Sequence, residues 1–86
     1  MNSSLVYSNT AVTSADGEVS INHHTDGIYI MNLDGSTNAT VLLNGKYNIL
    51  IHHSHNQSAT YTFIPGDYTK FQVITAAVTL SVFAVG

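Results

Sequence analysis

Histidine is the residue type in this chain best suited to chemistry at neutral pH, because imidazole binds metals and titrates near pH ~6.5. The five histidines form two groups, His23-His24 and His52-His53-Ser54-His55. An H-x-H pair on one strand places both rings on the same face, about 6–7 Å apart. His53 and His55 could therefore hold a metal such as Zn²⁺ if a further ligand arrived from elsewhere, for example around a three-fold axis.

A plainer interpretation is that these histidines are polar residues at strand ends and loop tips. Clustered histidines would also repel one another when protonated, which could loosen an interface below pH ~6. We therefore expect no resident cofactor, and we keep the His53–His55 metal site as an alternative.

The carboxylates favour turns over catalysis. Of the five acidic residues, Asp16, Asp26, Asp34 and Asp67 each adjoin a glycine, where an Asp side chain caps a turn. Glycoside hydrolysis needs two carboxylates that face each other across a cleft, and no such pair stands out. The sequence also lacks a G-x-S-x-G nucleophile motif and a phosphate-binding loop. We expect a protein that is not an enzyme.

Charge is scarce, which excludes several classes of partner. Only 8% of residues are charged, Lys46 and Lys70 are the only cations of the Lys/Arg type, and the formal net charge is −3. Nucleic-acid and polybasic membrane contacts need clustered cations, so neither partner is expected. The N-terminal residues do not resemble a signal peptide, and no run of apolar residues is long enough to span a membrane. We expect synthesis in a cytoplasm.

The elements that must position these residues are strands. Asp16-Gly17, Asp26-Gly27, Asp34-Gly35 and Asn44-Gly45 recur at short intervals, and β-branched residues dominate between them. The pattern is typical of an all-β meander or sandwich. We predict a small single-domain antiparallel β-sandwich or jelly roll over residues 1–86, with 1–4 as a flexible tail. About eight short strands are expected: 5–12, 18–23, 28–33, 39–43, 46–53, 59–63, 69–75 and 78–85.

The firmest local prediction is a hairpin around Asn44-Gly45. Asn-Gly is the pair best able to hold positive φ at both centres of a type I′ turn. Apolar runs flank the pair on both sides, which predicts that Leu43 is opposite Lys46.

The last strand is apolar on both faces near its end. Leu80, Val82 and Ala84 share one face, which we assign to the core, whereas Phe83 and Val85 lie on the other. A chain of this size without cysteine buries a modest core, so assembly would supply missing stability. We therefore expect Phe83 and Val85 at or near a subunit contact.

A binding function of another class is also open. Exposed aromatic rings can stack on sugars, and Tyr61, Phe63 and Tyr68 around the Pro65-Gly66 turn are the candidates. This alternative predicts a carbohydrate-binding β-sandwich, whereas core or interface packing is the competing explanation for the same rings.

Two segments resemble the C-terminal half of small tailed-bacteriophage virion proteins: Ile64-Pro65-Gly66-Asp67-Tyr68-Thr69-Lys70-Phe71-Gln72-Val73 and Thr79-Leu80-Ser81-Val82-Phe83-Ala84-Val85-Gly86. The likeness implies a capsid decoration, or cement, protein: a non-enzymatic β-sandwich or jelly roll, often trimeric, that clamps neighbouring capsomers.

The expected partners are then the major capsid protein or other virion subunits, within a homotrimer located in the virion. Phe83, Val85, Phe71 and Tyr68 are the candidate subunit-interface residues. A trimeric tail or fibre tip that holds a metal through the H-x-H pair is a further alternative.

Overall fold

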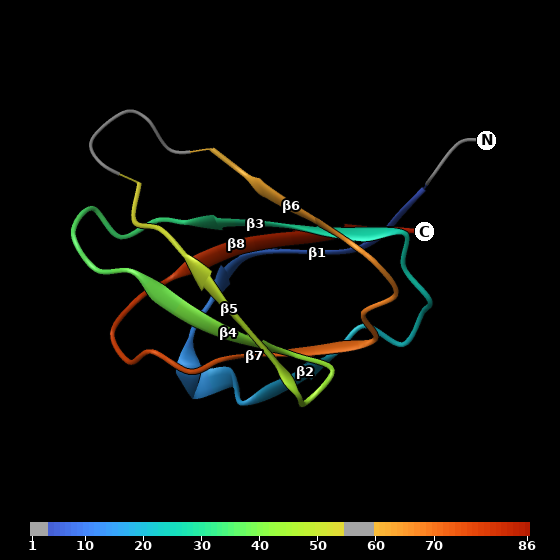
Figure 1. Cartoon of the computed structure of the whole chain (residues 1–86), viewed down its shortest axis with the longest axis horizontal. Coiled ribbons are helices and arrows are strands. Elements are labelled where there is room, and N and C mark those ends of the chain that lie inside the picture. The colour runs from blue at the N-terminus through green and yellow to red at the C-terminus, as the bar shows by residue number, and fades with distance from the viewer. Residues whose placement is uncertain (1–3, 55–59) are drawn as a thin grey trace.

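Two four-stranded antiparallel sheets face each other in a computed structural model that describes residues 4–54 and 60–86 (Figure 1). One sheet has the order β1-β8-β3-β6 and the other β2-β7-β4-β5. The expected β-sandwich is thus confirmed. The elements are β1 (Leu5–Val12), a 3-10 helix η1 (Ser14–Asp16), β2 (Glu18–Ser20), β3 (Gly27–Asn32), β4 (Ala39–Leu43), β5 (Tyr47–Ile51), β6 (Thr62–Pro65), β7 (Lys70–Val73) and β8 (Leu80–Val85).

The strands pair as one long hairpin rolled over on itself. β1 pairs with β8, β2 with β7, β3 with β6 and β4 with β5. Leu5 opposite Val85 and Glu18 opposite Gln72 are each symmetric in the sequence about Gly45. This nested pairing across two sheets is the topology of a jelly roll. Among the described strands only β4 and β5 are both consecutive and paired, so a meander is not formed.

The Asn44-Gly45 turn lies at the centre of this nested pairing. Asn44 and Gly45 have φ values of 55° and 73°, and the Lys46 N–H donates to the Leu43 carbonyl at 3.1 Å. The turn type is therefore as expected. The register is not, because Leu43 lies opposite Tyr47 and not opposite Lys46.

The other Asx-Gly pairs do not make hairpins. Gly17, with φ 65°, ends the 3-10 helix, and Gly27 is the first residue of β3. The carboxylate of Asp34 accepts the backbone N–H groups of Ser36 and Thr37, so it caps a turn between β3 and β4. In each case the chain crosses from one sheet to the other, which a tight hairpin turn would prevent.

Several strands are shorter than the pattern predicted. β2 ends before Asn22, whose φ is 60°, and β8 begins after Ala77, whose φ is 63°. A left-handed residue turns the chain out of the extended conformation, and only the tertiary fold places one there. β5 ends at Ile51, so His53 does not lie on a strand, and the expected start of the next strand at Ala59 lies outside the described residues.

The core fills the space between the sheets. Leu80, Val82 and Ala84 point inward from β8, as expected, and Phe71 of β7 is fully buried with its ring against Tyr7. The polar side chain of Asn32 is buried as well, and its amide donates to the carbonyl groups of Thr37 and Ile51. A buried polar group is costly when it is left without a hydrogen-bond partner, and both of these bonds spare the Asn32 amide that cost.

The first and last residues that the structure describes lie side by side. Ser4 and Gly86 exchange backbone hydrogen bonds of 3.1 and 2.9 Å, so Ser4 is not part of a flexible tail; residues 1–3 lie outside the described chain. In the described residues no helix is long and apolar enough to cross a membrane.

Candidate functional site

A row of aromatic rings runs across the outer face of the β1-β8-β3-β6 sheet. Ile28, Ile30 and Val82 point into the core, so their neighbours point outward, because side chains alternate along a strand. In register, Tyr29 of β3 lies between Phe83 of β8 and Phe63 of β6. With Tyr61, which adjoins β6, these residues form what we call the aromatic row: Tyr29, Tyr61, Phe63 and Phe83.

The rings contact one another in sequence. Tyr29 stacks on Phe83 with centroids 4.4 Å apart and an interplanar angle of 7°, and Phe63 lies 4.6 Å from Tyr29 on a neighbouring strand. Tyr61 meets Phe83 edge-on at 4.9 Å, and its hydroxyl lies 2.7 Å from the Ser81 hydroxyl. Cross-strand aromatic pairs of this kind hold the sheet in register and contribute about 0.2–1 kcal/mol each.

This sheet is free of charge. Strands β1, β8, β3 and β6 contain no Asp, Glu, Lys, Arg or His among their residues. The chain's acidic residues and lysines lie instead in loops, turns, η1, β2 and β7. Surfaces that become buried in protein contacts are depleted in charge and enriched in aromatic residues, which matches the aromatic row and its surroundings.

The row remains open at its ends. Phe63 is 46% exposed and Tyr61 is 40% exposed, while Tyr29 and Phe83 are half-buried between their neighbours. The faces of Tyr29 are occupied by Phe83 and Phe63, so the row offers ring edges and two terminal rings. Such a surface suits close packing against another apolar surface better than it suits stacking on a flat sugar ring.

The predicted interface residues fall in different places. Phe83 and Val85 lie on the outer face with the aromatic row, half-buried. Phe71 does not, because it is fully buried in the core, and its assignment to an interface is wrong for this chain. Tyr68 lies in the loop after β6, where its hydroxyl donates to the Pro65 carbonyl at 2.9 Å.

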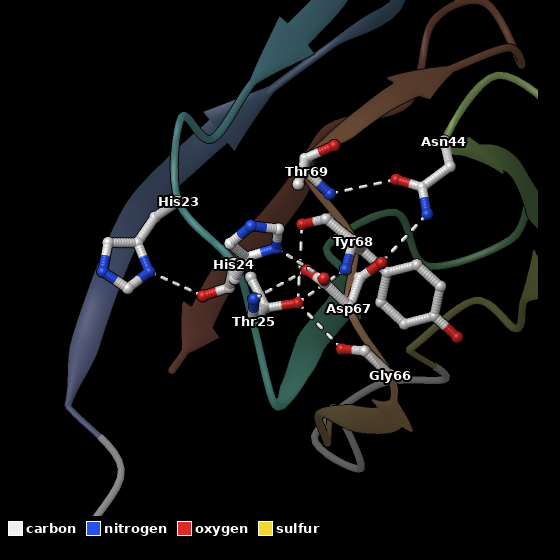
Figure 2. Close-up of polar contacts among 8 residues, drawn as sticks. All are labelled: His23, His24, Thr25, Asn44, Gly66, Asp67, Tyr68 and Thr69. Carbon is white, nitrogen blue, oxygen red and sulfur yellow. Dashed lines mark hydrogen bonds and ion pairs between the residues drawn. The ribbon is translucent and has the colours of Figure 1, made fainter.

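A second group of polar side chains ties three loops together at one end of the sandwich (Figure 2). The Asp67 carboxylate accepts a hydrogen bond from the Thr25 N–H at 3.0 Å and lies 2.6 Å from Nδ1 of the His24 ring. The backbone carbonyl of Asp67 accepts a hydrogen bond from the Asn44 side-chain amide at 3.0 Å. The Thr25 hydroxyl donates to the Gly66 carbonyl at 2.8 Å. We call this group the loop network: His24, Thr25, Asn44, Gly66, Asp67, Tyr68 and Thr69.

Electrostatics favour the ionised form of Asp67. The Thr25 N–H first, and then the His24 ring, lower the pKa of the Asp67 carboxyl below its usual value. The pKa of Asp34 is lowered too, chiefly by the N–H groups of Ser36 and Thr37. Both carboxylates therefore act as turn and loop caps, as the sequence predicted for acidic residues beside glycine.

Beside the loop network lies an open hollow of about 330 Å³. It is lined by Ser20, Asn22, His23, His24, Thr69 and Lys70. Asp67 orients His24 as a carboxylate orients a catalytic histidine, but a catalytic dyad also needs a nucleophile within reach of the ring. In the described chain, the ring of His24 hydrogen-bonds to Asp67 and to no hydroxyl.

The second histidine group offers no metal centre that the structure describes. The ring centroids of His52 and His53 lie 4.2 Å apart with an interplanar angle of 34°, and the His53 N–H donates to the Asn38 side chain. His55 lies outside the described residues, and within those residues no group of three or more metal-binding side chains comes together. The H-x-H metal site therefore stays a prediction.

Tyr29 is the member of the aromatic row that the sequence did not single out. The sequence feature that could have revealed the aromatic row is a set of four separate uncharged segments, each of which holds an outward aromatic or apolar residue. It could not be read without the strand order, because the segments are far apart in the chain.

Comparison with protein-family models, curated proteins and solved structures finds no match to this chain.

Proposed function

We propose that this chain is a structural assembly subunit, of the capsid-decoration type, that works by burying the aromatic row against another virion protein. The observation that carries the proposal is the absence of charge from all four strands behind the row. On a surface that stays in water, charged residues keep a protein soluble, so their absence there brings no advantage. On a surface that becomes buried in a contact, their absence avoids the free-energy cost of removing charged groups from water.

The jelly-roll topology is compatible with this proposal. Jelly rolls are frequent in viral capsid proteins, and they also occur in lectins and cupins, so the fold alone does not select among these classes. The ring geometry favours protein packing, because Tyr29 and Phe83 use their faces on each other.

The size of the face sets the strength of a single contact. Four strands about 4.8 Å apart and about six residues long give a footprint on the order of 400 Å². A stable interface buries about 800 Å² on each partner, so one such contact is weak alone. A repetitive shell overcomes this limit, because linked copies bind with much higher avidity than single ones.

The proposal is tested by co-sedimentation of the chain with capsids assembled from the major capsid protein of the same source. We expect Phe63→Ser to weaken capsid binding by about tenfold or more, the loss typical of an aromatic residue that carries much of an interface's binding energy. Ile74→Ser is the matched control, since Ile74 lies on the other side of the sandwich and is 47% exposed, close to the 46% of Phe63.

Two outcomes would contradict the proposal. The first is capsid binding that is equal for the wild type and Phe63→Ser. The second is a positive glycan array that is lost in Phe63→Ser while capsids do not bind, which would place the chain among the carbohydrate-binding jelly rolls.

A further inference from the structure

The four sheet edges differ in how well they are protected against pairing with another strand. Exposed edges are normally blunted by bulges, charges, proline or short length. β1 has register irregularities in its pairing with β8, β2 is three residues long and begins with Glu18, and β6 ends in Pro65. β5 has none of these devices: its sequence is Tyr-Asn-Ile-Leu-Ile, and its register with β4 is continuous.

The backbone N–H and C=O groups of β5 that point away from β4, toward the open edge of the sheet, belong to Asn48 and Leu50. The Asn44 N–H and the Thr40 carbonyl form hydrogen bonds with residues on the β7 side of β4. Because backbone groups alternate in direction along a strand, the N–H and C=O groups of Ala39, Val41 and Leu43 point the other way, toward β5. Their partners Tyr47, Ile49 and Ile51 therefore direct their backbone groups toward β4. The N–H and C=O groups of Asn48 and Leu50 point away from β4, toward the edge.

Exposed apolar surface lies at the same edge. Leu50 is 64% exposed, the highest value among the large apolar side chains of the described residues, and Tyr47 is 51% exposed. Among the described strands, β5 pairs with β4 alone.

We propose that β5 is a docking strand for β5 of a second copy of this chain. In an antiparallel pair centred on Ile49, Asn48 of each copy lies opposite Leu50 of the other. Both residues direct their N–H and C=O groups outward, so every one of these groups meets its complement. A two-fold contact of this kind is self-complementary and closes at a dimer.

Charge also favours a second copy as the occupant. Each copy carries a formal net charge of −3, yet β5 contains no charged residue. The flanking residues in this register are Lys46 of one copy and His52 of the other, so no carboxylate faces a carboxylate. Two acidic copies can therefore approach along this edge without strong like-charge repulsion.

The contact is small, which fixes the concentration range of the experiment. Five residues span about 17 Å, so the buried area falls below that of a standard interface and the dimer is weak. Sedimentation equilibrium of the full chain from about 10 µM to about 1 mM should show dimer increasing with concentration. Leu50→Lys should raise the dissociation constant about tenfold or more, since an edge lysine blocks strand pairing.

Two further variants separate pairing from folding. Asn48→Pro removes an outward N–H and leaves the β4 ladder intact, so the variant should fold and remain monomeric. Thr10→Lys places the same charge on the β1 edge and should dimerise as the wild type does.

Amide exchange gives a readout that does not depend on a variant. The amides of Asn48 and Leu50 should become protected as concentration rises, while that of Ile49 is protected throughout. A monomer at the highest concentration, or an oligomer that Leu50→Lys leaves unchanged, would overturn the proposal. Because Phe63→Ser tests the opposite sheet, capsid binding and dimerisation can fail independently.

Discussion

Asp67 connects three loops through one residue. Its carboxylate contacts the loop between β2 and β3, and its carbonyl holds the side chain of Asn44 in the β4–β5 turn. The Asn44 side chain in turn accepts the Thr69 N–H at 2.9 Å. Because the side chains of His24 and Asp67 are 87% and 51% exposed, the electrostatic interaction between them is screened by water. The backbone hydrogen bonds are therefore the durable part of the network.

Stability should fall as Asp67 is protonated. Its folded-state pKa lies below its unfolded value, so its contribution is present above the unfolded pKa of about 3.9 and is lost as pH falls through the folded pKa. Asp67→Asn should lower Tm at pH ~7, and the difference from wild type should shrink below pH ~3. Thermal unfolding followed by circular dichroism across pH measures this.

Thr25→Val is the control for this prediction. It removes the hydroxyl bonds to Gly66 and Tyr68 but keeps the Thr25 N–H on Asp67, so it should lower Tm at every pH without changing the pH profile. A gap between Asp67→Asn and wild type that stays constant down to pH ~2 would contradict the assignment.

At the scale of elements, the Phe63 ring of β6 packs against the backbone of β3 because Gly27 has no side chain. A Cβ at this position would overlap the Phe63 ring, whereas the backbone of Gly27 is not in the left-handed region. The glycine is therefore required by packing at the aromatic row and not by turn conformation. This explains why an Asp-Gly pair that looks like a turn instead begins a strand.

Gly27→Ala should destabilise the fold by about 1–3 kcal/mol through this overlap. Gly35→Ala is the matched control, because a Cβ there meets nothing within 4 Å and should be nearly neutral. Denaturant unfolding measures both. The double variant Gly27→Ala/Phe63→Ala should lose less than the sum of the single changes, and strict additivity would show that the overlap is not the cause.

At the scale of the whole molecule, nested pairing makes folding depend on distant contacts. β1 and β8 come from opposite ends of the chain, and among the strands that the structure describes the β4–β5 pair alone is local. Sandwiches dominated by non-local pairs fold in about milliseconds to seconds. The refolding time measured by stopped flow with tyrosine fluorescence should fall in this range. A microsecond phase that recovers the full fluorescence signal would contradict this prediction.

The outer face that carries the aromatic row and the β5 edge have separate roles in our proposals. In the proposed assembly the aromatic row would face a virion partner. The β5 edge belongs to the opposite sheet, so a copy could use both contacts together. The expected homotrimer stays a prediction, and the β5 contact would produce a two-fold dimer in its place. The mass of the particle-bound form distinguishes these assemblies.

The local features of the fold follow from residue order. The strands at Leu5–Val12 and Ala39–Leu43 were predicted with their observed bounds. Segments that are rich in strand-favouring residues and end at turn residues form strands of that length. The Asn44-Gly45 turn was predicted because both residues tolerate positive φ. The inward face of β8 was predicted because alternation is a property of a single strand.

Tertiary structure alone decided which distant segments became neighbours. Phe71 and Phe83 lie on different strands near the C-terminus. Phe71 is buried between the sheets, whereas Phe83 stacks on the outer face against Tyr29, a neighbour that comes from a distant strand. The same holds for the unprotected β5 edge, which exists because none of the described strands lies beyond β5 in its sheet. Pairing between strands far apart in the chain is set by the packing of the whole core, and no short stretch of sequence contains that information.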